Sequence, residues 1–179
     1  MVVFLFSPLL FLHGCFDTMT KIIQVSDSFI RPDNATPYGA ADLVANSATA
    51  GSVVPLAFHL GAGGSRITQV RLDKTDTDLT GAIFSVYLFG SSPTTAVGDN
   101  TAFTTASFTL SDIIDVAVVG QMVSASDNDY AMLNIGDATF LEGVYTSKET
   151  IYGLVVTGGT YTPLALETFT VTLTAVKVV

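Results

Sequence analysis

The chain has 179 residues, of which only 13% are charged, and its formal net charge at pH 7 is −9. A chain of this length can bury roughly 70% of its unfolded surface in one domain, so it needs neither a disulfide nor a metal to hold a core. Its seven basic residues are scattered rather than grouped for phosphate binding, which argues against a nucleic-acid-binding protein.

The first 18 residues are expected to lie outside the fold. Residues 2–12 are apolar, but the run is too short for a membrane span of about 20 residues. Residues 12–15 resemble the lipobox of bacterial lipoproteins, and lipidation of Cys15, the only cysteine, would attach the chain to a membrane. Signal peptides carry a basic residue before the apolar run, and none precedes this one. The competing interpretation is that translation begins at Met19.

Residues 19–50 are expected to form an N-terminal strand and an extended arm, and residues 51–179 a single β-domain. Residues 31–42 contain two prolines and a glycine and are typical of an irregular arm that crosses a surface. Pro55 interrupts the β-rich run 52–60, which indicates an edge strand or a bulge.

Two runs, 66–72 and 82–89, have the clearest pattern of central strands. The second run is apolar on both faces, which predicts a place in the middle of a sheet or against a neighbour. Tyr87 and Phe89 lie on its second face and are therefore candidate interface residues.

The remaining segments complete an all-β pattern. Residues 90–100 read as a loop, 102–110 as a strand, and 111–119 as either a strand or a short helix capped by Ser111. Short strands follow between 131 and 145, and 150–158 and 167–178 are expected to form an antiparallel pair. About eight strands with no helical pattern predict an antiparallel β-sandwich, jelly-roll-like in its connections.

The closing strand alternates strictly between apolar residues and threonines. Because an uncharged hydroxyl face desolvates at small cost, it can lie against another protein. We therefore expect the threonine face to lie at a subunit contact; its residues are Thr168, Thr170, Thr172 and Thr174.

No arrangement typical of catalysis is present, so we predict a protein that is not an enzyme and needs no cofactor. His59 is the only histidine after the leader, no G-x-S-x-G nucleophile motif occurs, and the residues after the leader cannot supply a zinc site. The acidic loop that contains Asp73, Asp76 and Asp78 is either a calcium site or a solvated turn.

Three segments together resemble a family of small tailed-phage proteins encoded beside the major capsid protein. The segments are GGSRITQVRL (63–72), FSVYLFGSSPTTAVGDNTAF (84–103) and IYGLVVTGGTYTPLALETFTVTLTA (151–175). The resemblance implies a virion protein, a capsid decoration or head-associated subunit, whose partners are the major capsid protein, another virion protein or further copies of itself. The alternatives are a bacterial cell-surface lipoprotein and a ligand-binding β-sandwich, for example a calcium-dependent carbohydrate-binding module.

Overall fold

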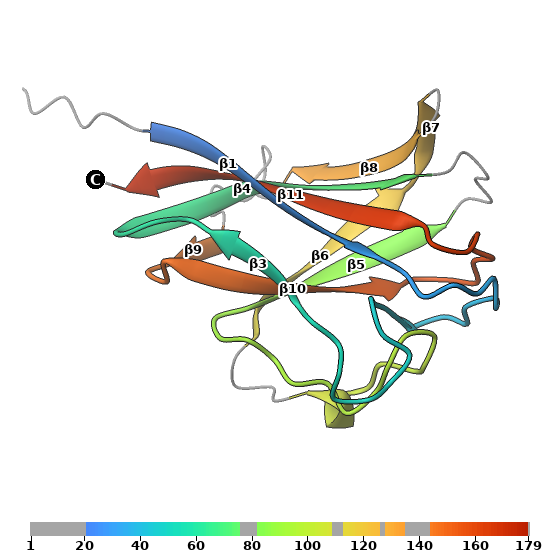
Figure 1. Cartoon of the computed structure of the whole chain (residues 1–179). Coiled ribbons are helices and arrows are strands. Elements are labelled where there is room, and N and C mark those ends of the chain that lie inside the picture. The colour runs from blue at the N-terminus through green and yellow to red at the C-terminus, as the bar shows by residue number, and fades with distance from the viewer. Residues whose placement is uncertain (1–20, 76–81, 109–112, 126–127, 135–143, 179) are drawn as a thin grey trace, which may run out of the picture.

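Two antiparallel sheets face each other in this computed structural model, which describes residues 21–75, 82–108, 113–125, 128–134 and 144–178 (Figure 1). The predicted all-β antiparallel sandwich is confirmed. The described residues form eleven strands rather than about eight, because four of the strands have only two to four residues.

The first sheet has six strands in the order β1-β11-β4-β8-β7, with β9 also paired to β4. Its central strands are long, and every pairing between them is antiparallel. The strands are β1 (Lys21–Ile30), β4 (Gly64–Thr75), β7 (Val123–Ala125), β8 (Asn128–Asn134), β9 (Val144–Thr146) and β11 (Thr168–Val178).

The second sheet has five strands in the order β2-β10-β5-β6, with β3 also paired to β10. They are β2 (Leu43–Val44), β3 (Leu56–His59), β5 (Ile83–Phe89), β6 (Ile113–Gln121) and β10 (Thr150–Thr157). For the described part of 111–119 the helix alternative is wrong, because residues 113–119 belong to β6, which pairs with β5. Pro55 precedes the short strand β3, which pairs with β10, as expected for an edge.

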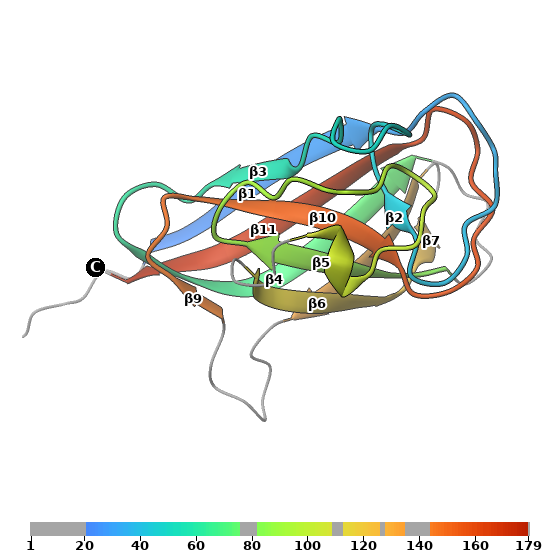
Figure 2. The ribbon, with the colours of Figure 1, turned by 90° about the horizontal axis from the view of Figure 1, so that it is seen from below.

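The predicted pairing of the last two strands with each other is wrong. Residues 158–167 cross from one sheet to the other, so β10 pairs with β5 while β11 pairs with β1 and β4 (Figure 2). The strand β1 is bonded to β11 along all ten of its residues, so the N-terminal strand belongs to the same sandwich as the rest of the chain.

The main core lies between the two sheets, where the alternating apolar residues of β4, β5, β10 and β11 meet. Its fully buried members include Leu72, Phe84, Val86, Phe169 and Val171. Burying each of these large side chains contributes about 1.5–3 kcal/mol relative to leaving it exposed.

A second core covers the outer face of the five-stranded sheet. Phe89 and Leu154 from the sheet are buried under Phe103 and Phe108, whose rings stack with centroids 4.7 Å apart. The long loop after β5 lies over this face (Figure 2). The two-faced strand 82–89 is thus confirmed as central, with β10 on one side and β6 on the other.

The strand predicted at 102–110 is wrong for its described part. Residues 105–107 form a short 3-10 helix, and the aromatic residues around it pack on the sheet instead of joining it. No helix in the described part of the chain is long and apolar enough to cross a membrane.

Candidate interaction surface

The threonine face lies on the outer side of the six-stranded sheet. Phe169, Val171 and Leu173 point into the core and are fully buried, whereas Thr170 and Thr172 between them are half-buried. The predicted alternation of β11 is therefore confirmed.

The neighbouring edge strand β1 extends this face. Ser26 lies opposite Thr172 and their hydroxyl oxygens are 2.8 Å apart, and Ser28 lies opposite Thr170. We call the outward residues of the two strands the hydroxyl face: Ile22, Gln24, Ser26, Ser28, Ile30, Thr168, Thr170, Thr172, Thr174 and Val176. None of these side chains is charged, and two of them, Ile22 and Ile30, are large apolar side chains that are mostly exposed.

Charge begins at the third strand, β4. Arg71 lies opposite Thr172, and its guanidinium is 2.5 Å from the carboxylate of Asp73. Gln69 lies opposite Thr174 and accepts a hydrogen bond from the threonine hydroxyl at 3.3 Å. The hydroxyl face is therefore bordered on one side by a row of polar and charged side chains.

Of the three calcium candidates, only Asp73 lies among the described residues. Asp73 is paired with Arg71 on the surface of β4, while Asp76 and Asp78 lie outside the described residues. Within the ranges that the structure describes, no three acidic, histidine or cysteine side chains are grouped as metal ligands.

Phe89 and Tyr87 have partners within the chain itself. Phe89 is fully buried and packs edge-on against Phe108, and half-buried Tyr87 packs edge-on against Phe103. The reason for expecting these two residues at a subunit contact is removed, because the apolar face that they form is already covered by the loop after β5.

His59, the remaining candidate for chemistry, lies exposed on β3, where its Nδ1 is hydrogen-bonded with the hydroxyl of Thr150 at 2.9 Å.

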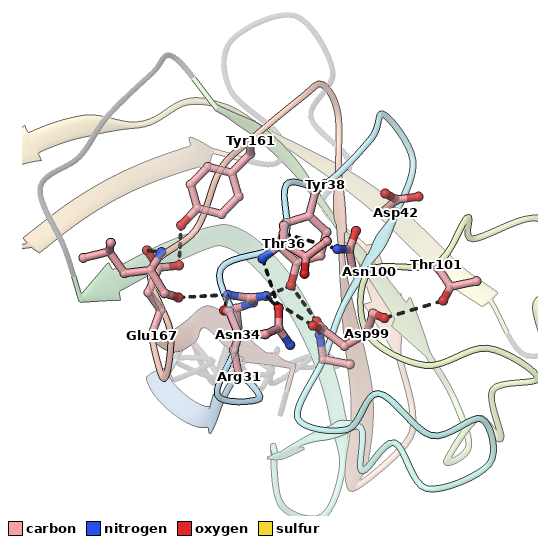
Figure 3. Close-up of polar contacts among 12 residues, drawn as sticks. Arg31, Asn34, Thr36, Tyr38, Asp42, Asp99, Asn100, Thr101, Tyr161 and Glu167 are labelled. Atoms are coloured by element: carbon pink, nitrogen blue, oxygen red, sulfur yellow. Dashed lines mark hydrogen bonds and ion pairs between the residues drawn. The ribbon is translucent and has the colours of Figure 1, made fainter.

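A buried polar network that the sequence analysis did not predict anchors the arm 31–42. The Arg31 guanidinium is fully buried, lies 3.2 Å from a carboxylate oxygen of Asp99, and donates to the hydroxyl of Tyr38 and to the carbonyl of Leu164 (Figure 3). The other Asp99 oxygen accepts hydrogen bonds from the Tyr38 hydroxyl at 2.6 Å and the Ala45 amide at 2.8 Å.

Burial is the main cause of a strongly raised pKa for the Tyr38 phenol, and the negative charge of Asp99 adds to it. Tyr38 therefore stays protonated and donates its hydrogen bond to Asp99.

A second buried ion pair lies beside the first. Lys74, near the end of β4, is 3.4 Å from the carboxylate of Glu167, and the Tyr161 hydroxyl donates to the same carboxylate. Burial raises the pKa of the Glu167 carboxyl, while the hydrogen bond from Tyr161 and the charge of Lys74 act in the opposite direction. The rings of Tyr38 and Tyr161 are stacked with centroids 5.9 Å apart and connect the two pairs.

The signal for this network in the sequence was faint. In a chain so poor in charge, Glu167 is an isolated charged residue within an uncharged segment, which is a reason to suspect burial in a pair. Nothing in the spacing of Arg31, Asp99 and Glu167 reveals that they meet, because the contacts are made between loops far apart in the chain.

No family model and no curated protein matches the chain. Among solved structures, a chain from "Structure of infectious bursal disease virus Gx strain" is similar at 13% identity with a TM-score of 0.33. The alignment covers 90% of this chain and 37% of that one, so this chain spans little more than a third of its length. A likeness at this level supports no conclusion about function.

Proposed function

We propose that the chain is a structural protein of a tailed-phage virion, a capsid decoration or head-associated subunit that acts through its interfaces. The resemblance of three segments to such proteins suggests the proposal, and the antiparallel sandwich is compatible with it. The observation that supports an interface function best is the hydroxyl face, an uncharged outer surface on β1 and β11 of a chain whose net charge is −9.

Elementary energetics favour a protein contact on this face. Burying a charged side chain without a partner costs several kcal/mol, whereas hydroxyl groups that already bond to one another, as Ser26 and Thr172 do, lose little on desolvation. A second copy or a capsid subunit can therefore cover the face without a compensating ion pair.

The size of the face indicates how far the contact must extend. Two paired strands of about ten residues measure about 30 Å by 10 Å, or about 300 Å², against about 800 Å² per partner in a stable interface. The contact must therefore continue beyond the two strands, and over β4 it would reach Gln69 and Arg71.

The location is tested by mass spectrometry of purified virions from the phage whose genome encodes the chain. The proposal expects peptides of this chain at a fixed ratio to the major capsid protein. Virions that lack the chain refute the virion function.

The interface is tested with the double variant Thr170→Lys and Thr172→Lys, which places two ammonium groups on the hydroxyl face. We expect it to lose self-association and binding to capsids, measured by light scattering and co-sedimentation, while its circular dichroism spectrum stays that of the wild type. The matched control is Thr160→Lys with Thr162→Lys, two exposed threonines with the same spacing in the loop before β11. Normal assembly of the first variant, or equal loss in both, contradicts an interface on the hydroxyl face.

A further inference from the structure

Lys74 and Glu167 form an unusual buried pair that joins two neighbouring strands. Lys74 lies in β4 opposite Phe169 of β11, and Glu167 immediately precedes β11. The Lys74 Nζ is 3.4 Å from the Glu167 Oε1, and the two side chains are 0% and 2% exposed. An amine and a carboxyl group from positions 93 residues apart are thus held together away from bulk water.

Two donors point at the carboxyl group. The Leu164 amide donates to Oε1 at 3.0 Å, and the Tyr161 hydroxyl donates to Oε2. The Tyr161 ring also lies beneath the ammonium group, with its centroid 5.3 Å from Nζ. Such donors stabilise negative charge that develops on a carboxyl oxygen when a nucleophile adds to the carbon.

The surroundings also favour the neutral form of the Glu167 carboxyl. Transfer of one proton from the Lys74 ammonium to the Glu167 carboxylate gives the amine and the acid that condensation requires, and burial lowers the cost of the neutral acid. The raised pKa of Glu167 agrees with this direction. A neutral buried lysine is a competent nucleophile.

We propose that Lys74 and Glu167 condense to form an intramolecular isopeptide bond between β4 and the start of β11. The Nζ lone pair adds to the Glu167 Cδ, and the Leu164 amide stabilises the charge that develops on Oε1. The bond between Cδ and Oε2 then breaks, and Oε2 leaves as water. One proton of this water is already on Oε2, and the other comes from Nζ through the Tyr161 hydroxyl. The products are one amide and one water molecule, so no oxidant, reductant or cofactor is consumed.

The other buried pair provides an internal contrast. Arg31 and Asp99 are as deeply buried, but a guanidinium does not lose its proton in proteins and is no nucleophile. Condensation is therefore specific to the lysine pair. This inference does not rest on the proposed virion function, since the reaction needs only the folded chain.

The test is mass spectrometry of the purified, folded full-length protein. We expect the chain to be lighter than its sequence by the mass of one water molecule. Trypsin should fail to cleave after Lys74 and should release a branched peptide in which residues 72–148 are joined to residues 149–177. Lys74→Arg should restore the full mass, whereas the control Lys177→Arg, on the same sheet but hydrogen-bonded to loop carbonyls, should keep the loss.

A readout of rate tests the part assigned to Tyr161. After refolding from denaturant, Tyr161→Phe should form the cross-link more slowly than the wild type, because it lacks the hydroxyl that relays the proton. A wild-type rate in this variant overturns that assignment.

The bond itself is judged on the wild type, so the result does not depend on whether a variant folds. The inference is overturned if the folded wild-type chain has the full mass and trypsin cleaves it after Lys74 into linear peptides. Lys74 and Glu167 then form only a non-covalent ion pair.

Discussion

The buried pair of Arg31 and Asp99 leads to the sharpest prediction about stability. In the variant Asp99→Ala the Arg31 guanidinium keeps its positive charge but loses its counter-charge in a site where its side chain is 0% exposed. Leaving such a charge uncompensated costs about 3–5 kcal/mol. The Tyr38 hydroxyl and the Ala45 amide each lose an acceptor as well, at about 1 kcal/mol each.

We therefore expect Asp99→Ala to lower the free energy of unfolding by about 5 kcal/mol, measured by urea denaturation with linear extrapolation. For a chain of this size the same loss corresponds to a fall in Tm of about 10 °C or more.

The surface pair supplies a matched control within the same chain. Arg71 and Asp73 are also an arginine and an aspartate in contact, but their side chains are 48% and 25% exposed. Asp73→Ala should therefore cost only about 0–1 kcal/mol. Similar losses in the two variants would refute the reasoning, which attributes the larger cost of Asp99→Ala to an uncompensated buried charge and two lost hydrogen-bond acceptors.

A double variant separates the two ways of losing the buried pair. Replacing Arg31 by methionine and Asp99 by leucine together removes both charges, so it should cost less than Asp99→Ala alone. A double variant that is less stable than the single one would show that the pair itself, rather than the orphaned charge, is what stabilises the arm.

Two further predictions concern other parts of the same region. A Cβ at Gly98 would lie 2.2 Å from the backbone carbonyl oxygen of Ala48, so Gly98→Ala should lower the free energy of unfolding by about 1–3 kcal/mol. In the control Gly159→Ala the new Cβ meets nothing within 4 Å, so the free energy of unfolding should change little. Urea denaturation of both variants measures the difference. The raised pKa of Tyr38 means that the folded chain retains a proton that the unfolded chain releases above a pH of about 10, so stability should fall as the pH rises past that value. Tyr38→Phe should lack this component, and an equal decline of wild type and variant between about pH 9 and 11 would contradict it.

The fold class follows from local patterning. The alternation in 167–178 specifies a strand with one buried face, and the two-sided apolar run 82–89 specifies a strand covered on both faces, because side chains of a strand point alternately to opposite sides. Both predictions depend only on neighbouring residues, and the structure confirms both.

Which strands become neighbours was not determined by those patterns. Strand order depends on how the connections cross between sheets, so the last two strands, adjacent in the chain, were wrongly expected to pair. For the same reason the strand pattern did not predict that Phe103 and Phe108 cover Phe89. The loop that carries these two residues packs on Phe89 only in the folded chain.

The sequence by itself determined an all-β chain with little charge, a two-sided central strand and an uncharged threonine face. Only the tertiary structure decided that this face is continued by β1, that Phe89 is covered from within, and that Arg31 meets Asp99 while Lys74 meets Glu167. The physical reason is distance along the chain: alternation is a property of adjacent residues, whereas the partner of a buried charge is chosen by the packing of segments that lie many residues apart.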